Sequence, residues 1–201
     1  MEQTAMQSDI ARLDHKIICD IVEPGSKVLD LGCGGGELLH MLTQAKNIKG
    51  QGIEISDEAI YKCVEKGLSV FHGDIDSGLA DYPAKSFDYV ILNQTMQQCR
   101  KAVFVIKESL RVGRWVVIGF PNFAFIAARL RMFFAGKTPV TESLPYNWYD
   151  TPNLHFLSIS DFTDFCAKED LLVFGKYFYS NSHPVNFWPN LLATNAIFVI
   201  G

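Results

Sequence analysis

The sequence predicts an α/β fold built around a doubly wound, mostly parallel β-sheet, and three observations carry that prediction. Short β-branched and aliphatic runs alternate with segments of helical period as far as residue 120. This alternation is typical of parallel strands joined by right-handed helical crossovers. A glycine-rich turn follows the first apolar run directly. The 201 residues are 48% apolar, which is enough for a full core, so we expect a single domain over 1–201.

The expected strands are short apolar runs. The run FDYVILN is apolar nearly throughout, as a strand covered on both faces should be. After residue 120 the alternation breaks, and the last two runs read as an antiparallel pair that completes the sheet. The strands are expected at 27–31, 49–55, 68–74, 87–93, 115–120, 171–180 and 195–201.

Helical spacing and end signals predict the helices. Gly67 and Gly113 follow two helical segments and are expected to end them. Ser160 or Asp161 is expected to cap the helix that begins in SISDF. The helices are expected at 8–22, 36–45, 57–67, 97–113, 122–136 and 158–170.

An irregular aromatic insertion is expected at about 137–158. This stretch is long, contains prolines and has no clear period. Structured loops of such length are often functional. The region between the last two strands, 181–194, is also expected to be irregular.

Composition and charge argue against several classes of protein. The formal net charge is −4 and no basic block is present, so a nucleic-acid footprint is not expected. The polar, acidic start does not look like a signal peptide. Pro121, Asn122, Arg129 and Arg131 interrupt the most apolar region, so no membrane span is expected there. We expect a cytoplasmic protein.

The cysteines are expected to be buried thiols in a reducing compartment. The five cysteines are scattered, and no CxxC pair occurs. The histidines do not stand at metal-ligand spacing from them, so no zinc or other metal site is expected.

The segment VLDLGCGGGELL, residues 28–39, is the strongest binding signal. A glycine-rich turn lets a ligand approach the backbone closely, and the helix after it offers free N–H groups. A P-loop is excluded because GxxxxGK is absent. The dinucleotide pattern GxGxxG fails because Glu37 stands where its third glycine should be.

The pattern that remains is DxGxGxG, and it resembles motif I of class I S-adenosylmethionine (SAM)-dependent methyltransferases. The resemblance implies a Rossmann-like, seven-stranded sheet whose last strand is antiparallel, and SAM or S-adenosyl-L-homocysteine as the ligand. It implies an acid for the cofactor's ammonium group in the loop, and a second acid for the ribose at the end of the second strand. The residues expected to bind cofactor are Asp30, Gly32, Cys33, Gly34, Gly36, Glu54, Ile55, Asp74, Ile75, Asn93 and Gln94.

No catalytic residue is assigned. Methyl transfer is a direct displacement that depends on alignment more than on a protein nucleophile. The residues after the fourth strand are NQTM. The proline-rich tetrapeptide of many amino-directed DNA and protein methyltransferases is missing there, which argues against those acceptors. His72 is expected to be structural.

Three segments of the second half resemble the bacterial methionine biosynthesis family MetW: RVGRWVVIGFPNF, LPYNWYDTPNLHF and FWPNLLATNAIFVI. The likeness runs from about Ile21 to near the end of the chain, with a departure at FPNFAFI. It implies a role in making methionine and a protein partner, a homoserine O-acyltransferase that uses acetyl or succinyl groups and needs this chain for full activity.

Three functions stay open at this point. The first is a SAM-binding partner that activates the acyltransferase. The second is a SAM-dependent methyltransferase of an unidentified small molecule, with a lid formed by Tyr146, Trp148, Tyr149 and His155. The third is a structural partner whose pocket is idle. The aromatic insertion serves as a ligand lid in one reading and as a partner surface in another, and the helix at 122–136 belongs either to the core or to a partner face.

Overall fold

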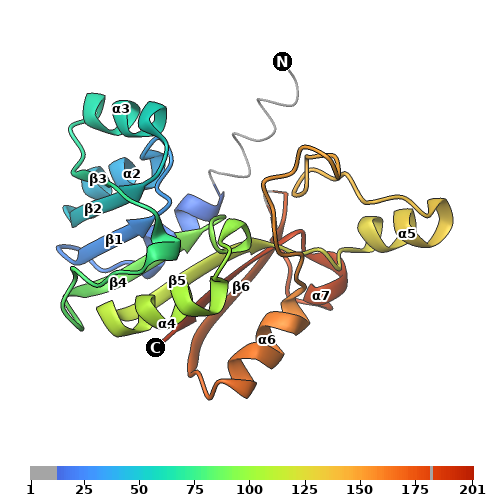
Figure 1. Ribbon diagram of the computed structural model, residues 1–201. Helices are drawn as coiled ribbons and strands as arrows, with labels where there is room; N and C mark the ends of the chain where they lie inside the picture. Colours follow the sequence, from blue (N-terminus) through green and yellow to red (C-terminus); the bar gives the residue numbers. More distant parts are fainter. Residues whose placement is uncertain (1–12, 182) are drawn as a thin grey trace.

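Eight strands form one mixed sheet in the order β3-β2-β1-β4-β5-β8-β6-β7 (Figure 1). The structure is a computed structural model and describes residues 13–181 and 183–201. Strands β1 to β5 pair in parallel, whereas β8 is antiparallel to β5 and β6, and β7 is antiparallel to β6. The strands are β1 Lys27–Leu31, β2 Lys49–Glu54, β3 Val70–His72, β4 Phe87–Asn93, β5 Gly113–Pro121, β6 Val173–Ser180, β7 His183–Pro184 and β8 Asn195–Ile200.

The α/β, mostly parallel fold is confirmed, with one strand more than expected. The additional strand is β7, which has two residues and pairs with the end of β6 through Tyr179 and Ser180. Two residues are too few to give a period, so no sequence pattern marks this strand. The antiparallel pair expected at the end of the chain is present as β6 and β8.

The helices follow the expected order, except that one short additional helix, at 189–192, lies in the region expected to be irregular. In the described residues before β1, helix covers 13–21, and the expected positions 8–12 lie outside the described part. The remaining helices are α2 Glu37–Lys46, α3 Asp57–Glu65, α4 Ala102–Val112, α5 Ile126–Ala135, α6 Ile159–Lys168 and α7 Pro189–Leu192, with 3₁₀ turns η1 Ile75–Ser77 and η2 Met96–Gln98.

Three helix starts differ from the prediction. The helix expected over 122–136 begins only at Ile126. The cap of α6 is Ser158, not Ser160 or Asp161. Asp161 instead forms the other half of a capping box, in which its side chain accepts from the Ser158 backbone N–H. The helix expected over 97–113 begins only at Ala102, because η2, the extended residue Cys99 and a turn at 100–101 come first.

Two hydrophobic cores cover the two faces of the sheet. Alternate residues of β4 show the division, since Ile91 packs with the helix at 13–21 and α2, whereas Val90 and Leu92 pack with α4 and α6. This period of two is what a strand covered on both faces requires. None of the described helices is long and apolar enough to cross a membrane.

The strand order reverses between β1 and β4, and the segments after the carboxyl ends of these strands meet there. Ligands of doubly wound sheets bind at such a switch point. Beyond the end of β5, helix α5 projects from the body (Figure 1), and Ala128 is its buried residue. Residues 136–158 contain neither helix nor strand.

Candidate functional site

The glycine loop between β1 and α2 is shaped by positive backbone dihedrals. Gly34 has φ +54°, and a Cβ added there would meet nothing within 4 Å. Gly36, with φ +77°, caps α2 and lies against Leu68 and Cys63, which a Cβ would meet at 2.5 and 2.8 Å. The two glycines therefore have different roles, because Gly36 permits close packing within the protein and Gly34 leaves open space beside the loop.

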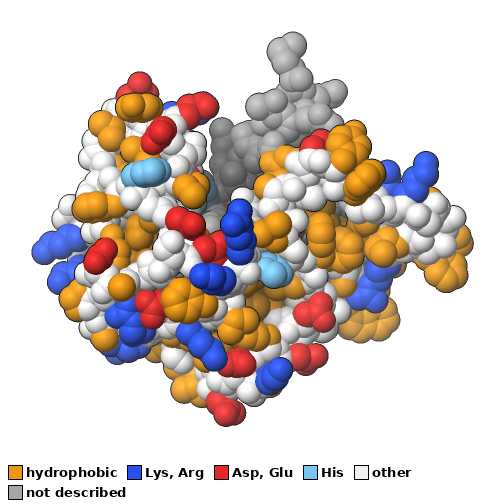
Figure 2. Space-filling view, in the orientation of Figure 1, with side chains coloured by type: hydrophobic (Ala, Val, Ile, Leu, Met, Phe, Trp, Pro, Cys, Tyr) orange, Lys and Arg blue, Asp and Glu red, His pale blue; other side chains and the backbone are white. Residues whose placement is uncertain are grey.

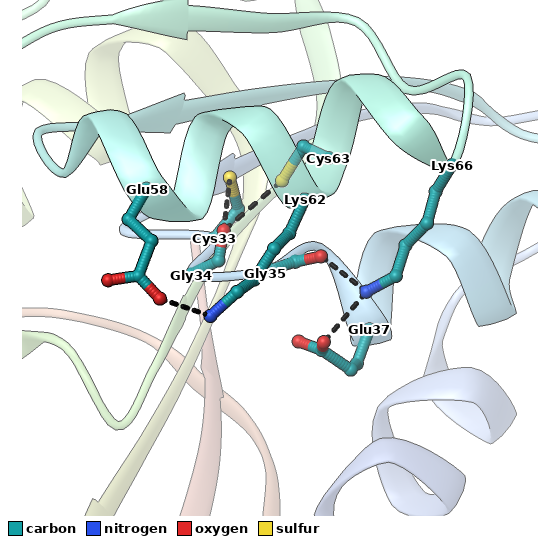
Figure 3. Close-up of polar contacts among 8 residues, drawn as sticks. All are labelled: Cys33, Gly34, Gly35, Glu37, Glu58, Lys62, Cys63 and Lys66. Atoms are coloured by element: carbon teal, nitrogen blue, oxygen red, sulfur yellow. Dashed lines mark hydrogen bonds and ion pairs between the residues drawn. The ribbon is translucent and has the colours of Figure 1, made fainter.

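The back of the loop is fastened to α3, as Figure 3 shows. The Cys63 thiol donates to the Gly34 carbonyl at 3.1 Å. The Lys66 ammonium donates to the Gly35 carbonyl at 2.5 Å and pairs with the Glu37 carboxylate at 2.7 Å. Glu37, the acid that breaks the dinucleotide pattern, is therefore matched by a lysine on the far side of the loop.

Glu54, at the end of β2, binds the front of the loop. Its Oε2 accepts from the Gly34 N–H at 2.8 Å, and its Oε1 accepts from the N–H groups of Ile55 and Ser56, both at 2.9 Å. Three backbone donors thus fix the orientation of this carboxylate at the place where the sequence predicts a ribose-binding acid.

Asp30, at the end of β1, is only 3% exposed. Burial, with the negative charge of Glu54 adding to it, raises the pKa of the Asp30 carboxyl to about 7. Desolvation of this kind disfavours the charged form, so a cation near Asp30 would favour its ionisation.

A cavity of about 580 Å³ opens at the carboxyl ends of the strands. Eight of the eleven residues expected to bind cofactor line it: Gly32, Gly34, Glu54, Ile55, Asp74, Ile75, Asn93 and Gln94. The other three, Asp30, Cys33 and Gly36, are not among the lining residues; Asp30 and Cys33 are buried.

Several residues that no sequence motif marks also line this cavity. Asp76 accepts from the backbone N–H groups of Arg100 and Lys101, both at 2.8 Å, and so joins η1 to the start of α4. Burial, followed by the charges of Asp76 and Asp74, raises the pKa of Cys99 to about 12, so this thiol stays protonated. The additional lining residues are Ile53, Gly73, Asp76, Thr95, Gln98, Cys99 and Arg100.

The aromatic insertion is attached to the loop after β4. The backbone N–H groups of Leu154 and His155 donate to the Gln97 carbonyl at 2.9 and 3.0 Å. The ring Nε2 of His155 lies 2.9 Å from the Cys99 carbonyl, which can only accept, so Nε2 carries the proton. His72 in β3 contacts the Ile55 carbonyl in the same way at 3.1 Å. Both histidines are used in local structure.

No cluster of three or more His, Cys, Asp or Glu side chains with metal-binding geometry occurs among residues 13–181 and 183–201. The cysteines are free thiols, and four of them are buried.

A family model described as methionine biosynthesis protein MetW matches residues 12–200. A protein of Rhodopirellula baltica, named bifunctional methionine biosynthesis protein MetXA/MetW, is 34% identical over 185 residues. That match covers 87% of this chain but only 30% of the relative, so the chain spans less than a third of the relative's length.

Two solved structures show the fold. A SAM-dependent methyltransferase of Thermotoga maritima, described as a possible histamine N-methyltransferase, is 16% identical, with a TM-score of 0.70 over 98% of this chain and 90% of that one. A SAM-dependent methyltransferase of Archaeoglobus fulgidus is also 16% identical, with a TM-score of 0.68 over 98% and 93%. The expected methyltransferase-like fold is thereby confirmed.

Proposed function

The chain belongs to the MetW family of methionine biosynthesis proteins, and from this premise we propose that it binds SAM or S-adenosylhomocysteine and activates a homoserine O-acyltransferase. The family membership supports a role in methionine biosynthesis. The acyltransferase partnership and the cofactor are the proposed parts.

The observation that carries the partnership is the composite name of the Rhodopirellula baltica relative. That relative joins MetXA and MetW in one protein, and this chain matches 30% of it. We take the MetXA part to be the acyltransferase that the family resemblance implies. Fusion holds two modules at high effective concentration, which benefits modules that act together. Where the two are separate chains, a binding surface is needed to hold them together.

An exposed aromatic surface supports that role. Phe133 and Phe134, on α5, are 82% and 77% exposed, and Trp148 and Tyr149 in the insertion are also largely exposed. Figure 2 shows hydrophobic side chains gathered over α5 and the adjoining loop. Aromatic side chains supply much of the binding energy of protein interfaces, and exposed apolar patches mark such sites.

The cavity at the glycine loop suits the cofactor. Its volume falls in the range of small-molecule pockets. Gly34 leaves its open side free of a side chain, and Glu54 Oε2, which accepts from one backbone N–H, has a lone pair free for a hydroxyl group. The lining holds three carboxylates, Glu54, Asp74 and Asp76, and one guanidinium, that of Arg100. The excess of negative charge favours a cationic ligand without phosphates. When bound, SAM would supply an activated methyl group.

The test is a rate measurement. A homoserine O-acyltransferase from the same source is assayed for acyl-homoserine formation with and without this chain, first without SAM and then with saturating S-adenosylhomocysteine. The expected result is a clear rise in rate on adding the chain, and a further change on adding the ligand. No rise in either condition would refute the partnership. An equal rise in rate with and without S-adenosylhomocysteine would refute regulation through the cavity.

A methyltransferase of a small molecule is the second candidate. A second cavity adjoins the first, and both are lined by Asn93, Gln94 and Gln98. An acceptor bound there would lie beside a bound cofactor. Formation of S-adenosylhomocysteine that depends on one defined metabolite would favour this function.

A further inference from the structure

The second cavity has a volume of about 300 Å³ and lies between the helix at 13–21, the loop after β4 and the aromatic insertion. Carboxamides are the commonest side chains in its wall, whereas most small-molecule pockets are lined predominantly by hydrophobic and aromatic side chains. Its described lining residues are Asp14, His15, Asn93, Gln94, Gln97, Gln98, Pro121, Glu142, Ser143, Pro145, Tyr146, Asn153 and Asn195.

Three hydrogen-bond acceptors in this wall have no partner at hydrogen-bond geometry among the described residues. They are Asp14 Oδ1, Asn93 Oδ1 and Gln97 Oε1, and all three atoms are buried. A buried polar atom without a partner costs about 1–3 kcal/mol. Three such atoms around one cavity therefore call for a ligand that brings several hydrogen-bond donors.

Asp14 is the charged member of the group. Its side chain is 2% exposed, and its Oδ2 accepts from Gln94 Nε2 at 3.4 Å. Gln94 also donates to Asn195 Oδ1 at 3.3 Å and holds a backbone φ of +57°. A non-glycine residue in that region is uncommon, and such strain gathers at functional sites.

The negative charge of the cavity wall favours a cationic ligand. Asp14 and Glu142 are the acids in the described lining, and neither lysine nor arginine is present in that set. Burial raises the pKa of Asp14 to about 6, so this carboxyl is mostly ionised at neutral pH. Burial lowers the pKa of His15, which keeps this side chain neutral.

We propose that this cavity binds a small molecule through a primary ammonium group, which Asp14 holds together with the carboxamide oxygens of Asn93 and Gln97. An ammonium group carries one positive charge and three N–H donors, which matches three acceptors of which one is a carboxylate. A divalent metal fits less well, because the described residues offer no cluster of three metal-binding side chains. The proposal does not depend on the acyltransferase partnership.

A purely internal role for Asp14 is the competing explanation. The hydroxyl of Tyr179, fully buried in the sheet, also has no partner at hydrogen-bond geometry among the described residues, and it is a donor beside Asp14. Its interaction with the Asp14 carboxyl lowers the pKa of Asp14 and raises that of Tyr179. If the pair served only the core, substituting Asp14 would lower stability and leave ligand binding unaffected.

The test is a titration of the full chain by NMR chemical-shift changes with n-butylamine, n-butanol and L-homoserine. n-Butylamine is expected to bind at least tenfold more tightly than n-butanol. Asp14→Asn should weaken n-butylamine binding at least tenfold, and Asp20→Asn, an exposed acid on the same helix, should not change it. L-Homoserine binding more tightly than n-butylamine identifies an amino acid as the ligand class, and weaker binding identifies a free amine.

Glu142→Gln is a second test variant, in case Asp14→Asn does not fold. Glu142 lies in the irregular insertion and not in a core element, so its substitution should leave the fold intact. It should weaken n-butylamine binding about threefold with an unchanged melting temperature. Equal affinities for n-butylamine and n-butanol would overturn the proposal. So would a folded Asp14→Asn variant that binds n-butylamine as the unsubstituted chain does.

Discussion

The Glu54 carboxylate accepts a hydrogen bond from the backbone N–H of Gly34 at 2.8 Å. This bond ties the carboxyl end of β2 to the loop after β1, and both residues line the same cavity. The other oxygen of Glu54 accepts from Ile55 and Ser56. One side chain therefore sets the relative position of two cavity walls.

Glu54→Gln is expected to weaken binding of S-adenosylhomocysteine at least tenfold. The amide presents N–H groups where backbone N–H donors already point, so a buried donor loses its acceptor, at a cost of about 1–3 kcal/mol. Isothermal titration calorimetry measures the affinity, and urea denaturation measures the stability. Glu58→Gln is the control, because Glu58 is exposed and pairs with Lys62. Equal affinity in Glu54→Gln and the control would refute a ligand role for Glu54.

Gly34→Leu is expected to abolish cofactor binding, whereas Gly67→Leu is expected to preserve it. Both glycines have positive φ, +54° and +71°, and a Cβ on either meets nothing within 4 Å. Each substitution should therefore cost a similar 1–2 kcal/mol in backbone strain, but only Gly34 lines the cavity. Calorimetry with S-adenosylhomocysteine separates the two variants. If acyltransferase activation survives in a Gly34→Leu variant that no longer binds the ligand, the pocket is idle in that role.

The glycine loop and its acids could be predicted from the sequence because their spacing is local and the order of strands fixes the rest. Glu54 stands 20 residues from Gly34, within one strand–helix–strand unit. The contact between Asp14 and Gln94 could not be predicted, because 80 residues separate them and only the completed sheet brings them together. The predicted cap of α6 was wrong for a local reason. SISD offers three capping side chains, and Ser158 is the cap because it forms a capping box with Asp161.

The unfolding free energy is expected to fall as pH rises from about 4 to about 7, in part because of Asp30. Its carboxyl has a pKa of about 7 in the folded protein and an ordinary value near 3.8 when unfolded. Between these values the folded state holds the extra proton, so stability is highest below the lower pKa and declines by up to about 1.4 kcal/mol per pH unit. Asp30→Asn should reduce this slope and raise stability at pH 8. Urea denaturation at pH 5, 6.5 and 8 checks both effects, and equal slopes in the two proteins would contradict this reading of Asp30.

The double substitution Phe133→Ser/Phe134→Ser is expected to reduce activation of a homoserine O-acyltransferase at least tenfold without changing the melting temperature. The two rings are 82% and 77% exposed and pack edge to face on each other, at 5.0 Å between centroids. Their loss therefore removes little from the core, and surface changes of this kind usually alter stability by about 0.5 kcal/mol or less. At an interface, by contrast, two aromatic anchors contribute several kcal/mol of binding free energy. Tyr61→Ser is the control, because Tyr61 is similarly exposed but lies on α3, at the far end of the sheet from α5 (Figure 1). Acyl-homoserine formation at increasing concentrations of each variant gives the half-activating concentration. If the double variant and the Tyr61→Ser control activate alike, the partner binds elsewhere, and α5 is not the docking surface.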